Sequence, residues 1–148
     1  MIQRKQSLWL LVAALLNSGL LYFCLYKAHT LVNGIDTETC MRVNGPNEFL
    51  LLLLTLVLII LPIVAIFLFK NRKQQRSLVY LNIVAVIGFI ATLLMHVANF
   101  NSQANPTPTT GGYAFGSVLP VLSIIFLIMA IRGINKDQKL VKSLDRLR

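Results

Sequence analysis

FLLLLLTLVLIILPIVAIFLF, residues 49–69, is an apolar stretch of 21 residues that contains no Asp, Glu, Lys or Arg. A helix needs roughly 20 apolar residues to cross the hydrocarbon core of a membrane, which is about 30 Å thick. Three further stretches, residues 7–26, 78–100 and 113–131, also lack charged side chains and have similar lengths. Together the four stretches hold 83 of the 148 residues, so the sequence predicts an all-α membrane protein.

The composition leaves room for a single membrane domain over residues 1–148. Charged residues make up only 13% of the chain, whereas soluble proteins carry about 25%. The longest connection, residues 27–48, is too short for an independent core, which takes roughly 40 residues. We therefore expect an antiparallel four-transmembrane-helix bundle, followed by a cytoplasmic tail at residues 132–148.

The basic residues predict which way the chain crosses the membrane. Twelve of the 14 Lys and Arg residues lie in the N-terminal segment, in the connection 70–77 and in the tail. Basic residues beside membrane spans stay in the cytoplasm. Both termini are therefore expected in the cytoplasm, with the connections 27–48 and 101–112 outside. Because these charges flank membrane spans, we expect no nucleic-acid partner.

Weakly polar residues within the spans mark the faces expected inside the bundle. In the third span they fall within a sector of about 120°, plotted at about 100° per residue. Such residues let helices approach closely and form hydrogen bonds between them. The predicted polar face combines Asn17 of the first span with Asn82, Thr92, His96 and Asn99 of the third, beside Ala85 and Gly88.

Two prolines predict kinks in the spans that contain them. Pro62 lacks the N–H that would bond the Leu58 carbonyl, and Pro120 likewise frees the carbonyl of Gly116. Between the spans, Asn33-Gly34 and the β-prone residues 37–43 are compatible with a small hairpin. The polar, Pro-, Thr- and Gly-rich residues 101–112 are expected to form an irregular exposed loop.

The tail is expected to form an amphipathic helix on the inner membrane surface. Leu140, Leu144 and Leu147 recur at helical spacing among Lys and Arg residues. Such a helix binds lipid, and its basic face favours anionic headgroups; the same pattern could dock a partner helix. The candidate cytoplasmic surface for lipid or a partner comprises Arg4, Lys136, Lys139, Lys142, Arg146 and Arg148.

Few residues suit catalysis, and no Asp or Glu lies within a span. Cys24 and Cys40 do not form the C-x-x-C pair of redox enzymes; a structural disulfide and two free thiols are both open. With only His29 and His96, haem bound by two histidines of one chain is not expected, and a metal site including loop carboxylates is a further alternative. We predict no cofactor, no metal and no catalytic residue.

Both ends of the chain carry a family resemblance. Residues 1–10 read MIQRKQSLWL and residues 136–148 read KDQKLVKSLDRLR. With the four spans, these pieces resemble the Bacteroidota family of small membrane proteins catalogued as domain of unknown function 4293, over the whole chain. The resemblance implies a bacterial inner (cytoplasmic) membrane location, and it implies no activity and no catalytic residues.

Three functional hypotheses follow. The first is a non-enzymatic accessory or scaffold subunit of a membrane complex, whose partners are membrane lipid and another membrane protein or a second copy. The alternative is binding or transport of a small or lipidic molecule through the polar face of the third span. A third reading is an enzyme that uses His96, which would require that residue to converge with Asp36, Glu38 or Glu48.

Overall fold

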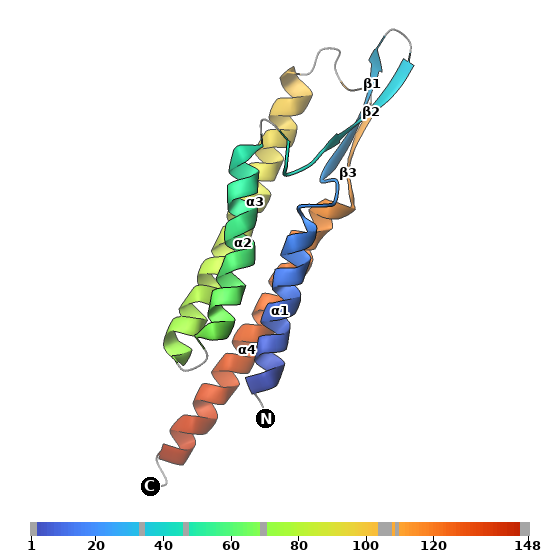
Figure 1. The fold of residues 1–148 in the computed structure, drawn as a ribbon. Helices are drawn as coiled ribbons and strands as arrows, with labels where there is room; N and C mark the ends of the chain where they lie inside the picture. The colour runs from blue at the N-terminus through green and yellow to red at the C-terminus, as the bar shows by residue number, and fades with distance from the viewer. Residues whose placement is uncertain are drawn as a thin grey trace.

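The computed structural model describes residues 3–32, 35–45, 48–68, 71–103, 108 and 110–145. Four helices lie side by side, and a small sheet lies beyond one end of them (Figure 1). The elements in chain order are α1 (Gln3–Gly19), β1 (Tyr26–Val32), β2 (Ile35–Met41), α2 (Phe49–Phe67), α3 (Arg72–Gln103), β3 (Thr110–Tyr113), the 3₁₀ turn η1 (Phe115–Val118) and α4 (Leu119–Asp145).

Three helical segments are long and apolar enough to cross a membrane. They are Phe49–Phe67, Arg72–Ser102 and Phe115–Gln138, while Gln6–Gly19 is a shorter apolar helix. These segments make the chain consistent with a membrane protein, as the sequence predicts. The second predicted span corresponds to α2, although Phe69, its expected last residue, lies outside the described residues.

The first helix ends earlier than predicted. The sequence places a span over residues 7–26, but α1 ends at Gly19 and the chain then turns, with Phe23 N–H donating to the Gly19 carbonyl. Leu20 and Leu25 of this turn are fully buried. Hydropathy does not distinguish an apolar residue in a helix from one buried in a turn, so the apolar run overstates the helix length.

The last predicted span differs at both ends. Tyr113 lies in β3, and α4 begins at Leu119, so Pro120 lies in its first turn. A proline there breaks no hydrogen bond of the helix, because first-turn N–H groups have no partner within it. The expected kink is therefore absent at this position, and the Gly116 carbonyl accepts a bond from the Leu119 N–H instead.

The predicted tail is not a separate helix, because α4 continues without a break from the span to Asp145. Packing explains the continuation: Ile134 is buried, and Arg72 of α3 lies 3.4 Å from the Asp137 carboxylate. Side chains beyond residue 138 lie outside the description, so the amphipathic character of the tail stays a prediction.

The connections between the helices build one three-stranded antiparallel sheet with the order β2-β1-β3. The hairpin compatible with the sequence is present, although its turn residues Asn33 and Gly34 lie outside the described residues. The expected irregular loop at 101–112 was wrong in part, because it contains the end of α3 and most of β3. Gly111 of β3 allows this pairing, since a Cβ there would collide with the Tyr26 hydroxyl.

The helices pack as a ring in which α1 contacts α4 and α2, and α3 contacts α2 and α4. The buried stripe of α3 repeats every three or four residues, as expected for a helix with one inward face. This stripe comprises Gln75, Val79, Asn82, Val86, Phe89, Leu93 and Val97. It differs from the predicted polar face, which shares only Asn82 with it.

Candidate functional site

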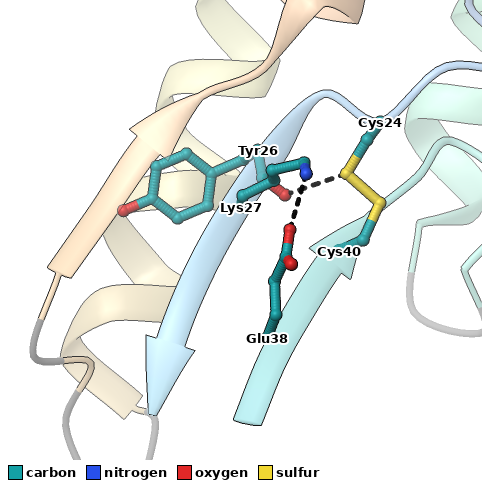
Figure 2. The surroundings of a disulfide bond; sticks show 5 residues. All are labelled: Cys24, Tyr26, Lys27, Glu38 and Cys40. Carbon is teal, nitrogen blue, oxygen red and sulfur yellow. Dashed lines mark hydrogen bonds and ion pairs between the residues drawn. A yellow bond between two sulfur atoms is a disulfide. The ribbon is translucent and has the colours of Figure 1, made fainter. Parts of the chain in front are cut away.

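The sheet is fixed to the helices by a disulfide bond between Cys24 and Cys40 (Figure 2). Cys24 lies in the turn after α1, and Cys40 lies near the end of β2. The Ala114 N–H donates to the Leu25 carbonyl, and the Gly116 N–H donates to the Cys24 carbonyl. The turn between α1 and β1 is therefore held covalently by β2 and by hydrogen bonds to the segment after β3.

One face of the sheet packs on the C-terminal end of α3 through Tyr26. This side chain is 5% exposed, and its hydroxyl donates to the Asn101 side-chain oxygen at 3.2 Å. Its ring makes edge-to-face contacts with Phe100 and Tyr113. Sequence patterning could not reveal this contact, because it joins residues 75 positions apart in the chain.

The opposite face of the sheet carries paired charges. Lys27 lies 2.6 Å from Glu38, and His29 lies 3.3 Å from Asp36. The Lys27 ammonium, first by its hydrogen bond and then by its charge, lowers the pKa of Glu38. The carboxylate of Glu38 therefore stays ionised to lower pH than an isolated glutamate.

Asn17 forms the buried polar contact that the sequence could anticipate. Its side chain is fully buried in α1, and its amide nitrogen donates to the Leu58 carbonyl at 3.1 Å. Leu58 is the residue whose carbonyl Pro62 frees, because Pro62 lies one turn later inside α2. Asn17 thus replaces a bond that the proline removes.

Asn82 is also fully buried, but neither of its amide atoms has a hydrogen-bond partner among the described residues. The other members of the predicted polar face lie elsewhere. Thr92 is half-buried and donates to the Gly88 carbonyl of its own helix, and Asn99 is exposed. The structure therefore does not gather these residues around one cavity.

His96 contacts Glu48, one of the three carboxylates of which the enzyme reading requires at least one, so the contact that this reading requires is present. Its Nδ1 atom lies 3.0 Å from Glu48 Oε2, and this oxygen is buried without a hydrogen bond among the described residues. The pair links α3 to the residue that precedes α2. Asp36 and Glu38 pair instead with His29 and Lys27 on the sheet. In the part of the chain that is described, no group of three or more His, Cys, Asp or Glu residues could hold a metal ion.

The candidate cytoplasmic surface is described only in part. Lys136 is exposed on α4. Arg4, Lys139 and Lys142 lie in helices, but their side chains are outside the description, and Arg146 and Arg148 lie outside the described residues. Sequence reasoning missed two arginines at this end. Arg72 pairs with Asp137, and Arg76 donates to the side chains of Asn135 and Gln138 at 3.4 and 3.3 Å.

A comparison with known families finds one match. A family model described as Domain of unknown function (DUF4293) matches residues 2–147. No curated protein and no solved structure matches the chain. The match confirms the family that the two terminal segments predict, while the Bacteroidota origin stays a prediction.

Proposed function

The chain belongs to this family, whose description leaves the activity open. We propose that the protein is a small accessory or scaffold subunit of an inner-membrane complex, without catalytic activity of its own. The proposal depends on how the chain crosses the membrane and on what the sheet presents outside it. The polar-face alternative has less support, because the residues on which it depended do not share a buried face.

We include four crossings and cytoplasmic termini in this proposal. The short helix α1 runs beside α4 over about two thirds of the thickness of the hydrocarbon core. A Cβ on Gly19 would lie 3.1 Å from the Leu119 side chain, and one on Gly133 would lie 2.9 Å from Gln6. Residues 119–133 of a helix cover about 21 Å. The buried apolar turn after Gly19 adds to the length of chain that can cross the membrane. These contacts support a crossing by α1 alongside α4.

The exposed aromatic side chains support placing the sheet at a membrane–water interface, and the disulfide supports placing it on the non-cytoplasmic side. Large aromatic side chains are exposed where the helices meet the sheet, as expected for residues at a membrane–water interface. These side chains are Tyr22, Phe23, Phe49, Tyr113 and Phe115. In addition, disulfides persist in oxidising compartments, which suits the bond between Cys24 and Cys40.

The observation that carries the accessory role is the free edge of β2. Within the described part of the chain this strand pairs with β1 on one side only, and residues 35–39 are exposed. An exposed edge strand offers backbone N–H and C=O groups that can pair with an extended segment of another protein. The disulfide and the contacts of Tyr26 hold that edge in a fixed position above the helices.

Affinity purification with site-specific photo-crosslinking tests the proposal. A photo-crosslinking amino acid replaces Ile35 on the β2 edge, or Ser77 on α3 as the control; both positions are exposed. We expect one stoichiometric partner in mild detergent, crosslinked from position 35 and not from position 77. Recovery of the protein alone, or equal crosslinking from both positions, would overturn the role.

A further inference from the structure

A cavity of about 710 Å³ lies beside the disulfide, between the segment after β2 and the outer part of α2. Its lining includes Leu21, Cys40, Arg42, Asn44, Leu52 and Leu56. This size is within the range of sites that bind small molecules, roughly 300–1,000 Å³. Apolar side chains of α2 form one wall, and a cationic side chain lies on the other.

The polar wall of this cavity is held in place by several bonds. The Asn44 side chain donates to the Leu21 carbonyl at 3.1 Å, and the Leu25 N–H donates to the Met41 carbonyl at 2.9 Å. Val43, between Arg42 and Asn44, is fully buried. The disulfide at Cys40 fixes the chain two residues before Arg42. The cavity is therefore formed by the fold and not by loose side chains.

The charge of Arg42 points to an anionic occupant. Its side chain is exposed and forms no ion pair or hydrogen bond with the described residues. Lys27, the other basic residue on this side, is already paired with Glu38. The uncompensated cation stands beside Leu52 and Leu56, and the latter is 46% exposed. An amphiphile with a negative head and an apolar chain matches both walls.

We propose that this cavity binds an anionic phospholipid of the outer leaflet, with its phosphate on Arg42 and one acyl chain along Leu52 and Leu56. A guanidinium binds phosphate through two parallel hydrogen bonds, which favours it over a single point charge. The site is separate from the β2 edge, so it goes beyond the accessory role. Only the choice of leaflet rests on the proposed topology.

Native mass spectrometry of the full-length protein in detergent tests the site, with phosphatidylglycerol as the anionic probe. Phosphatidylcholine, which has the same phosphate but no net charge, is the zwitterionic comparison. Arg42→Gln is expected to weaken phosphatidylglycerol binding about tenfold, in line with the loss of a charge-assisted contact. Lys27→Gln removes one positive charge from the same side but lies outside the cavity, and it is expected to bind normally. Leu56→Trp places a larger side chain on the apolar wall and so narrows the cavity. This variant is expected to weaken phosphatidylglycerol binding without a change in melting temperature.

Four results would overturn the proposal. Equal losses of phosphatidylglycerol binding in Arg42→Gln and Lys27→Gln would show that the net charge of the protein attracts the lipid and that Arg42 has no special role. Unchanged phosphatidylglycerol binding in Arg42→Gln would exclude the headgroup contact with Arg42. Unchanged binding in Leu56→Trp would exclude the acyl-chain contact with α2. Equal binding of the two lipids would exclude the net negative charge of the headgroup as the source of selectivity. None of these results depends on whether a protein partner is recovered.

Discussion

At the scale of single residues, the contact between Asn17 and the Leu58 carbonyl explains how α2 accommodates Pro62. We expect Asn17→Leu to lower the free energy of unfolding by about 1 kcal/mol, because the carbonyl loses its donor. In a Pro62→Ala background the loss is expected to shrink, since residue 62 then supplies a backbone N–H. Thermal unfolding in detergent of the original protein, the two single variants and the double variant measures the coupling between Asn17 and Pro62. Equal losses in both backgrounds would refute it.

Asn82 is the opposite case, because its buried amide has no partner among the described residues. Asn82→Leu keeps the side-chain size and removes the unsatisfied amide. We expect the substitution to raise the free energy of unfolding by about 1–3 kcal/mol, measured as a higher melting temperature. A lower melting temperature would mean that the amide binds a group, such as water, that stabilises the fold. Asn17→Leu, which removes an amide whose nitrogen donates a hydrogen bond although its oxygen has no partner among the described residues, is the matched control.

Two glycines show how backbone contacts decide the effect of a methyl group. A Cβ on Gly116 would lie 2.5 Å from the Cys24 carbonyl oxygen, whereas one on Gly88 would meet nothing within 4 Å. We expect Gly116→Ala to destabilise the fold by about 1–3 kcal/mol. Gly88→Ala should stabilise α3 by up to about 1 kcal/mol. Melting temperatures that move in the same direction for both variants would contradict this reading.

At the scale of the elements, the disulfide is expected to contribute much of the stability of the sheet. It joins residues 16 positions apart, for which chain entropy alone predicts about 3 kcal/mol. Replacing both cysteines with serine should therefore lower the free energy of unfolding by about 3 kcal/mol. Thermal denaturation with and without reductant measures the loss. Reductant should affect only the protein that retains the cysteines. An unchanged transition would show that β1 and β2 pair equally well without the bond.

The sequence predicted the elements whose signal is local. The apolar run of residues 49–69 predicts α2, and Asn33-Gly34 favours the hairpin of β1 and β2. It did not predict β3, because Gly111 and Gly112 have no side chains to alternate and their partners lie far away in β1. Nor did it predict the end of α1, since buried leucines read alike in a helix and in a turn. Of the candidate site residues, Asn17 and Asn82 are buried as expected. Thr92, His96 and Asn99 lie on a side of α3 next to its buried stripe, where they are half-buried or exposed.

At the scale of the whole molecule, the proposed topology can be tested directly. A membrane-impermeant maleimide should label Ile35→Cys from outside cells with a permeable outer membrane, but Ser77→Cys only after the inner membrane is broken. Both positions are exposed. An N-terminal tag should likewise resist external protease, because α1 is proposed to cross beside α4. A tag cleaved from outside would leave three crossings, and early labelling of Ser77→Cys would reverse the orientation.

The central position of β1 in the sheet has a consequence for the timing of synthesis. β2 follows β1 almost immediately, but β3 begins only at Thr110 (Figure 1). At about 5–20 residues per second, the second neighbour of β1 is made several seconds after the first. During that interval β1 is an open edge, and in the proposed topology it closes only when the chain beyond α3 has been exported. If the sheet lies outside as proposed, export of the second half of the protein sets how long β1 of a newly made molecule stays open to pairing with the wrong strand.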